Sequence, residues 1–89
     1  MNDPKFTGNG WEDYLYWQSQ DKKTLKKINS LIKEILRTPY EGLGKPEPLR
    51  EDKSGYWSRR IDSANRIVYR VLADDSVELT ALRTHYQDK

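Results

Sequence analysis

Apolar side chains recur at every third or fourth position between residues 21 and 37. This spacing places them on one face of a helix, for which Asp21 is a suitable N-cap. The helix is expected to end near Arg37, because Thr38 precedes Pro39 and the residue before a proline is disfavoured in the helical conformation. The pattern therefore predicts a helix over residues 21–37, whose apolar stripe consists of Leu25, Ile28, Leu31, Ile32, Ile35 and Leu36.

The segment before this helix is rich in aromatic side chains. Trp11, Tyr14, Leu15 and Trp17 follow a helical spacing and predict a first, short helix of about two turns that packs its rings into the core. Residues 5–7 are a candidate edge strand, but the sequence GNG at residues 8–10 is expected to break any continuation. The two helices, joined by a few residues, are expected to form an antiparallel hairpin.

After residue 53 the pattern changes from helical spacing to alternation. Strands are predicted over residues 56–61, over residues 65–72, and from Val77 to near Thr84, where Val77, Leu79 and Ala81 mark the third strand. Short turns between the strands favour an antiparallel meander. The second strand alternates, with Ile67, Tyr69 and Val71 on one face and Arg66, Val68 and Arg70 on the other.

These elements predict an α+β fold. We expect two N-terminal helices packed on one face of a three- to four-stranded antiparallel sheet, within a single domain over residues 1–89. The face that carries Arg66 and Arg70 is then left open. Residues 40–53 are expected to form the loop that connects the helices to the strands.

Composition narrows the possible functions. The chain has 89 residues, 35% of them hydrophobic, which suits one domain with a modest core. It has no cysteine and one histidine, so a disulfide framework, a thiolate metal site and a His-rich zinc site are excluded, and no metal or other cofactor is expected. No apolar run approaches the roughly 18 residues that span a bilayer, which predicts a cytoplasmic protein without membrane association.

Charge is unevenly distributed although the net charge is only +2. Residues 21–37 carry six Lys and Arg against two carboxylates, and residues 45–70 carry seven against four. Two adjacent basic blocks favour a nucleic-acid partner, although a row of helical lysines is usually just a solvated face. That row consists of Lys22, Lys23, Lys26, Lys27 and Lys33.

The second basic block contains half of the candidate groups for RNA cleavage, and residues 85–86 contain the other half. RNA is cut without a metal when its 2′-hydroxyl attacks the adjacent phosphorus, which needs a base, an acid and a cation. Glu47, held between Pro46 and Pro48, is a candidate base, and His85 is a candidate acid because imidazole titrates near neutral pH. The phosphate would be held by Arg66, whereas Tyr86 would stack on a base or hydrogen-bond the phosphate. Further RNA-binding candidates are Arg50, Lys45 and Arg60.

Each of these candidates also has an ordinary structural interpretation. Pro-Glu-Pro is often only a rigid surface loop, and a lone histidine near a C-terminus is often a plain surface residue. Arg66 could pair with Asp62 across a turn. Residue types and spacing alone therefore leave two alternatives, a nuclease and a non-catalytic basic module that binds RNA or the ribosome.

Six segments in order resemble the Txe/YoeB family, toxins of bacterial toxin–antitoxin modules within the RelE superfamily. The segments are residues 11–17 (WEDYLYW), 37–42 (RTPYEG), 44–49 (GKPEPL), 54–61 (SGYWSRRI), 66–69 (RIVY) and the pair His85-Tyr86. The resemblance implies one microbial-ribonuclease-like domain that cuts mRNA in the ribosomal A site. It also implies that Glu47 is the general base, that Arg66 stabilises the phosphate, and that His85 and Tyr86 serve acid catalysis and substrate binding.

The same resemblance implies partners. A YefM-like antitoxin is expected to neutralise the toxin, the two together are expected to repress their own operon by binding operator DNA, and the toxin is able to dimerise. An inactive relative that serves mainly as a co-repressor is a further alternative. The sequence departs from the family at Asn65, where histidine is usual, at Thr84, where an aromatic residue is usual, and in residues 87–89, which extend past the usual final tyrosine.

Overall fold

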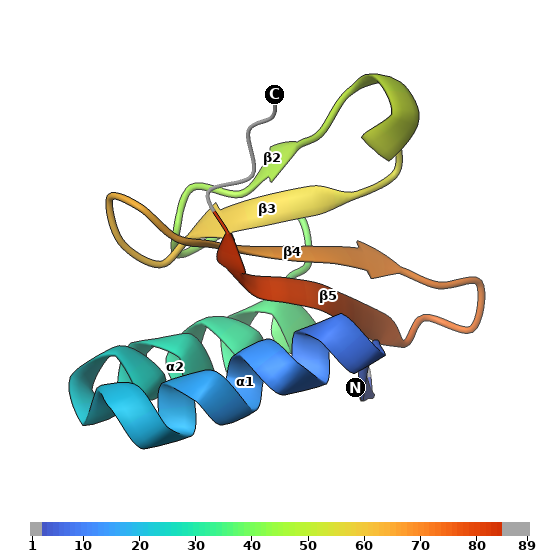
Figure 1. Cartoon of the computed structure of the whole chain (residues 1–89). Helices are drawn as coiled ribbons and strands as arrows, with labels where there is room; N and C mark the ends of the chain where they lie inside the picture. The colour runs from blue at the N-terminus through green and yellow to red at the C-terminus, as the bar shows by residue number, and fades with distance from the viewer. Residues whose placement is uncertain (1–2, 85–89) are drawn as a thin grey trace.

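The computed structural model describes residues 3–84, and the side chains of residues 3–83. Two helices lie side by side against one face of a five-stranded sheet with the strand order β1-β5-β4-β3-β2, and the other face is left uncovered by helices (Figure 1). The predicted α+β class is therefore confirmed. The elements are β1 (Pro4–Phe6), α1 (Gly8–Gln20), α2 (Lys22–Arg37), β2 (Glu47–Pro48), the 3-10 turn η1 (Glu51–Lys53), β3 (Trp57–Arg60), β4 (Arg66–Val71) and β5 (Val77–Thr84).

Helix α2 matches its prediction closely. The Asp21 side chain caps it by accepting hydrogen bonds from the backbone N–H of Lys23 at 3.1 Å and from the hydroxyl of Thr24 at 2.7 Å. Ile28, Leu31 and Ile35 are buried against the sheet. None of the helices in the described residues is both long and apolar enough to cross a membrane.

Helix α1 is longer than predicted, because residues 8–10 form its first turn instead of breaking the chain. The Thr7 hydroxyl accepts a hydrogen bond from the backbone N–H of Gly10 at 3.0 Å and so caps the helix. Gly10 packs so closely on the backbone carbonyl of Leu79 that a Cβ atom would clash with it. This glycine therefore permits close helix–strand packing.

The two outer strands correct the predicted sheet. β1 pairs with β5 in parallel, and β2 pairs with β3 in antiparallel, so the sheet has five strands and mixed direction. β1 has three residues and β2 only two. Strands this short give no readable alternation, which is why residues 40–53 were expected to be loop throughout.

Strand β5 is irregular where it passes β4. Register shifts occur between the pairs Arg66–Thr84 and Val68–Ala81, and again before Tyr69–Leu79, so β5 contains extra residues relative to β4. The alternation Val77, Leu79, Ala81 therefore does not continue: Leu82, not Ala81, is fully buried in the core.

Candidate functional site

Glu47 and Arg66 meet on the open face of the sheet. An Nη2 atom of Arg66 donates to Oε1 of Glu47 at 2.8 Å, and the two side chains are 21% and 59% exposed, respectively. Arg66 thus pairs with Glu47, the acid between the two prolines. The alternative pairing of Arg66 with Asp62, which the sequence allowed, is wrong. The carboxylate of Asp62 instead accepts hydrogen bonds from the backbone N–H groups of Ala64 at 2.8 Å and Asn65 at 2.7 Å. Partial burial raises the pKa of Asp62, but these hydrogen bonds outweigh it and keep that pKa below its usual value.

The register of three strands brings this pair together. Glu47 lies opposite Ser58 of β3, and Ser58 lies opposite Val68 of β4. Arg66 is two residues before Val68, on the same face and about 6.6 Å along the strand. The long arginine side chain spans this diagonal, so a strand of two residues is enough to place the carboxylate beside it.

The C-terminal half of the predicted site lies outside the described residues. His85 and Tyr86 both fall there, and the last described residue is Thr84. Thr84 is the register partner of Arg66. The described chain therefore ends beside the Glu47–Arg66 pair.

Behind the site, Arg59 holds the loop that leads into β2. Its side chain is fully buried on the helix-covered face, and Nε donates to the hydroxyl of Tyr69 at 3.1 Å. Its two terminal nitrogens donate to the backbone carbonyls of Thr38, Glu41 and Leu43. The Tyr69 hydroxyl donates to the carbonyl of Pro39 at 2.6 Å. Burial raises the pKa of Tyr69, although the nearby guanidinium opposes the shift.

Sequence reasoning missed Arg59 as a positioning residue. A signal was present, because strand alternation puts Arg59 on the same face as Trp57, which packs against the core. A backbone hydrogen bond from Arg60 to the carbonyl of Gly44, at 2.7 Å, fixes the same loop from outside. Together these contacts set the position from which Glu47 starts β2.

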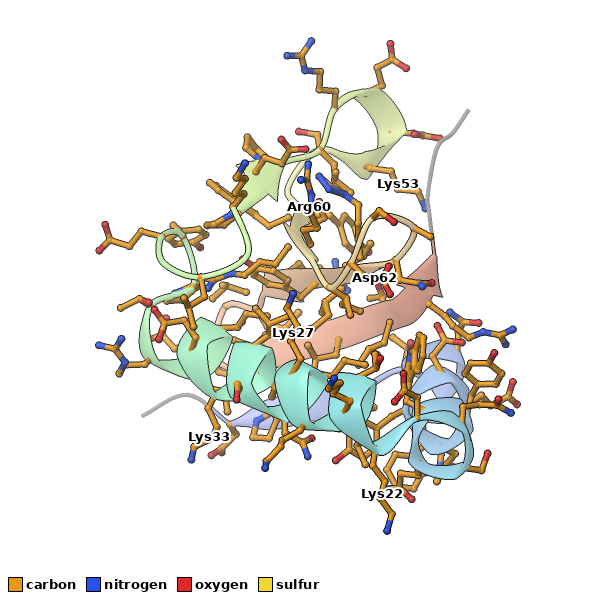
Figure 2. The ribbon with its side chains drawn as sticks, turned by 90° about the vertical axis from the view of Figure 1, so that its left-hand side faces the viewer. Lys22, Lys27, Lys33, Lys53, Arg60 and Asp62 are labelled. Carbon is orange, nitrogen blue, oxygen red and sulfur yellow. The ribbon has the colours of Figure 1, made fainter. Side chains whose placement is uncertain are left out.

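Two of the three predicted RNA-binding residues line a common hollow. Lys45 and Arg60 meet Lys27 of α2 around a cavity of about 320 Å³ whose other lining residues are Ser30, Leu31, Leu43 and Gly44. Figure 2 shows Lys27 on the side of α2 toward Arg60, whereas Lys22 and Lys33 lie on the side away from it. Arg50 is not among the lining residues; it is the exposed residue that precedes η1.

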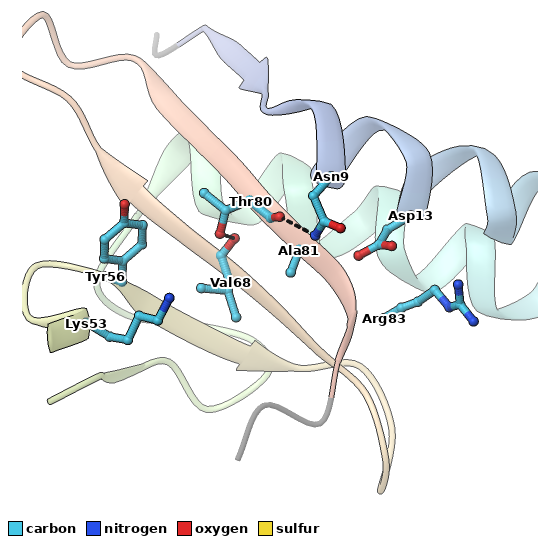
Figure 3. Close-up of a pocket in the computed structure, with 8 residues that line it drawn as sticks. All are labelled: Asn9, Asp13, Lys53, Tyr56, Val68, Thr80, Ala81 and Arg83. Atoms are coloured by element: carbon cyan, nitrogen blue, oxygen red, sulfur yellow. Dashed lines mark hydrogen bonds between the residues drawn. The ribbon is translucent and has the colours of Figure 1, made fainter. Parts of the chain in front are cut away.

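A larger hollow of about 460 Å³ opens beside β5. It is lined from three directions, by η1 and the residues after it, by β4 and β5, and by the start of α1 (Figure 3): Lys53, Tyr56, Val68, Thr80, Ala81, Arg83, Asn9 and Asp13. Neither α1 residue was predicted to line a site. Residues 8–10 were interpreted as a break, and the helix that follows, which contains Asp13, was expected only to pack its rings into the core. In residues 3–84, no group of three or more His, Cys, Asp or Glu is arranged to hold a metal ion.

Comparison with known proteins adds a consistent set of relatives. A family model described as "YoeB-like toxin of bacterial type II toxin-antitoxin system" matches residues 6–86. Toxin YoeB of Escherichia coli (strain K12) is 59% identical over 76 residues, which cover 85% of this chain and 89% of the relative. Toxin YoeB of Streptomyces coelicolor is 53% identical over 81 residues, which cover 91% of this chain and 95% of the relative.

Solved structures of YoeB proteins are similar to this chain as well. A YoeB/ParE toxin from Agrobacterium tumefaciens superposes with a TM-score of 0.90 at 47% identity, covering 94% of this chain and 99% of that one. A YoeB–YefM complex and a YoeB dimer, both from Staphylococcus aureus, each give a TM-score of 0.86, at 41% and 42% identity. They cover 97% and 96% of this chain, and 99% and 98% of their own.

Proposed function

This chain belongs to the YoeB-like toxin family of bacterial type II toxin–antitoxin systems, and on that premise we propose that it inhibits translation by cutting mRNA in the A site of the ribosome. The observation that supports this most directly is the contact between Glu47 and Arg66. It puts a carboxylate and a guanidinium, the two groups that a phosphate transesterification needs at its attacking side, within 2.8 Å of each other on the open face of the sheet.

The proposed reaction needs no metal. The mRNA phosphate competes with Glu47 for the Arg66 guanidinium, which binds two phosphate oxygens, and this frees the carboxylate. Glu47 then takes the proton of the 2′-hydroxyl while the 2′-oxygen bonds to phosphorus. The bond from phosphorus to the 5′-oxygen breaks, and protonated His85 gives its proton to that oxygen. The products are a 2′,3′-cyclic phosphate and a free 5′-hydroxyl.

The exposure of the pair supports this exchange. Glu47 is 59% exposed, and an ion pair so accessible to solvent is worth only about 0–1 kcal/mol. A phosphate therefore displaces the carboxylate at little cost. In the free protein the pair holds Arg66 in position. Tyr86 is proposed to orient the substrate, and Arg50, Lys45 and Arg60 are proposed to bind the RNA backbone.

Partners are proposed from the solved relatives. Because a Staphylococcus aureus YoeB occurs with YefM, we propose that a YefM-like antitoxin neutralises this toxin, and that operator DNA is bound only by the toxin–antitoxin complex. A YoeB dimer from the same organism supports a homodimer of this chain. The toxin is proposed to act in the cytoplasm as a single domain.

The test is to map mRNA 5′ ends and their chemistry after the toxin is induced. We expect cuts inside translated codons that leave 5′-hydroxyl ends and 2′,3′-cyclic or 3′-phosphates, and that disappear when translation initiation is blocked. Folded Glu47→Gln and Arg66→Gln variants should lose these cuts. Ends with 5′-phosphates, or cuts of equal strength in the double variant, would overturn the proposal.

A non-catalytic basic module is the second candidate, and the hollow lined by Lys27, Lys45 and Arg60 favours it. Three cations around one cavity suit a phosphate of ribosomal RNA without any cleavage. This candidate predicts arrest of translation with intact mRNA. Lys27→Gln should then weaken ribosome binding, whereas Lys33→Gln, on the other side of α2, should not.

A further inference from the structure

The hollow beside β5 lies on the same face of β4 as the Glu47–Arg66 pair, although neither of these two residues lines it. Val68, in its floor, is two residues from Arg66 on the same face of β4, about 6.6 Å along the strand. Val68 also lies opposite Ser58, the register partner of Glu47. A nucleotide next to a phosphate held by Arg66, on the side of Val68, is therefore close to this hollow.

Side chains of α1 enter the hollow because they complete the edge of β5. β1 covers that edge only as far as Leu79. Beyond it, Asn9 Nδ2 donates to the Thr80 carbonyl at 2.9 Å, and the backbone N–H of Leu82 donates to Asp13 Oδ2 at 2.9 Å. These bonds take the place of a neighbouring strand. They also fix Asn9 and Asp13 in position, so their remaining polar atoms have defined places.

Counting only contacts within residues 3–84, the polar atoms left available in the hollow are mostly acceptors. Asp13 keeps Oδ1, because Oδ2 is used by Leu82. The Thr80 hydroxyl gives its hydrogen to the Val68 carbonyl at 3.1 Å and keeps only its lone pairs. Asn9 keeps its carboxamide oxygen and one N–H. A ligand group that reaches these atoms must therefore bring hydrogen-bond donors.

The rest of the lining suits a nucleotide. Val68 and Ala81 form an apolar floor between the two sides, and Tyr56 stands as an aromatic wall whose ring contacts the Arg70 guanidinium at 5.2 Å (Figure 3). Cations stand at both ends: Lys53, which has no acidic partner in residues 3–84, and Arg83, whose guanidinium lies 3.7 Å from the Tyr16 ring centroid. Phosphates suit these ends, and a planar base suits the floor.

We propose that this hollow binds the nucleobase next to the scissile phosphate and selects adenine and cytosine over uracil. The amino group of adenine or cytosine donates to Asp13 Oδ1, and the adjacent ring nitrogen accepts from the free N–H of Asn9. Uracil offers only N3–H to the carboxylate, and this donor lies between two carbonyls. One carbonyl oxygen can accept from Asn9, but the other then lies against the Asp13 carboxylate, which is unfavourable. The inference rests on the proposed function only for the identity of the ligand as mRNA, and the binding itself is measurable without cleavage.

The experiment is a titration of the full-length protein with adenosine, cytidine and uridine 3′-monophosphates, followed by the methyl NMR signals of Val68 and Ala81. We expect these signals to shift, and the adenine and cytosine nucleotides to bind at least about fivefold more tightly than the uridine nucleotide, the lower range for base discrimination by paired hydrogen bonds. Equal affinity for all three nucleotides, or unshifted Val68 and Ala81 signals, would overturn the proposal.

Asp13→Asn is the sharpest variant. Its amide oxygen still accepts from Leu82, so the fold is kept, but an N–H replaces Oδ1 in the hollow. The preference against uridine should fall to about equal affinity. Glu12→Gln is the matched control: it removes a carboxylate from the neighbouring position of α1, outside the hollow, and should keep the preference. A preference that survives Asp13→Asn contradicts the assignment.

Mapped mRNA ends separate the two proposals. If the wild type cuts mRNA and Asp13→Asn changes base preference at one position beside the cut, both hold. If cutting occurs with unchanged preference in Asp13→Asn, only the hollow's assignment fails. If nothing is cut but nucleotides still bind selectively, the proposed function fails and the base site remains.

Discussion

Arg59 and Arg66 stand on adjacent strands of one sheet and face opposite sides. Arg59 is fully buried on the helix-covered side, and its guanidinium donates to a phenol and to backbone carbonyls. Arg66 lies on the open side, 21% exposed, and within residues 3–84 its one ion-pair partner is the carboxylate of Glu47. The same side chain is thus used once as a structural connector and once as an accessible cation.

The difference teaches which charges are available for chemistry. A buried charge that donates four hydrogen bonds leaves costly unpaired groups when it moves, so Arg59 is fixed in place. A solvent-accessible pair exchanges partners at small cost. The fixed arginine holds the loop 38–44 from which Glu47 emerges, and the movable arginine meets the phosphate. Substitutions that affect stability and activity should therefore separate between the two faces.

The largest expected effect is on activity at the open face. Glu47→Gln keeps the shape of the side chain and a weaker hydrogen bond to Arg66, but it removes the proton acceptor. Loss of a general base lowers the rate by about 10²- to 10⁴-fold. The measurement is the rate of mRNA cleavage on purified translating ribosomes, together with the urea unfolding midpoint. A variant that cleaves at a rate within threefold of the wild type, a change of about 0.7 kcal/mol in barrier height, would contradict the assignment of Glu47 on the open face as the general base.

The next effect is on stability at the covered face. Arg59→Met fills the space but leaves the carbonyls of Thr38, Glu41 and Leu43 without their donors. These hydrogen bonds are part-buried, so water replaces some of the lost donors, and the free energy of unfolding should fall by about 1–3 kcal/mol. Urea unfolding measures it, and Arg60→Met is the control. Arg60 is the next residue and exposed, so its loss should stay within about 0.5 kcal/mol.

These two arginines also show how far the sequence predicts the molecule. Alternation along residues 57–60 places Arg59 inward, but arginine is almost never fully buried without partners, and its partners come from a loop some 16 to 21 residues away in the sequence. That pairing is tertiary and has no local signal. The helices and the central strands, by contrast, follow from periodicity because each element is long enough to show it.

The candidate site was predictable in its residues and not in its contacts. The acid between two prolines and the arginine on the polar face of β4 were identifiable from residue type and position. Their contact depends on β2, two residues long, and its pairing with β3. The hollow depends on the first turn of α1. Glycine normally disfavours a helix, but Gly10 stands in this turn because close packing on Leu79 needs it.

A double-mutant cycle sharpens the comparison at a smaller scale. The Glu47→Gln and Arg66→Gln variants, alone and together, should show a coupling in unfolding free energy of about 0.2–1 kcal/mol, the range for exposed ion pairs. The same cycle with Arg59→Met and Tyr69→Phe, across the 3.1 Å bond, should give a larger coupling, because that bond is buried. Urea unfolding of all variants measures both. Equal coupling energies for the Glu47–Arg66 pair and the Arg59–Tyr69 pair would show that burial does not determine the strength of these two contacts.

The smallest effect concerns a second exposed carboxylate, which differs from Glu47 in being held by several donors. Asp74 accepts hydrogen bonds from the hydroxyl and the backbone N–H of Ser76 and pairs with Lys5 of β1 at 3.4 Å. The Ser76 hydroxyl is the main cause that lowers the pKa of Asp74 from 3.8 to about 2. Since the folded pKa is lower than the unfolded one, the ionised carboxylate stabilises the fold above about pH 4, and this contribution is lost as the pH falls toward 2.

The difference in unfolding free energy between the wild type and Asp74→Asn should thus be constant near neutral pH and shrink between pH 4 and pH 2. Urea unfolding at a series of pH values measures this difference. Glu12→Gln, which removes an exposed carboxylate of α1 without hydrogen bonds in residues 3–84, is the control and should show no such narrowing. Narrowing of equal size in both variants would mean that overall charge, not the Ser76 and Lys5 contacts, sets the acid response. Exposure alone therefore does not make a carboxylate movable: Asp74 is 65% exposed and Glu47 59%, and they differ in the number of donors that hold them.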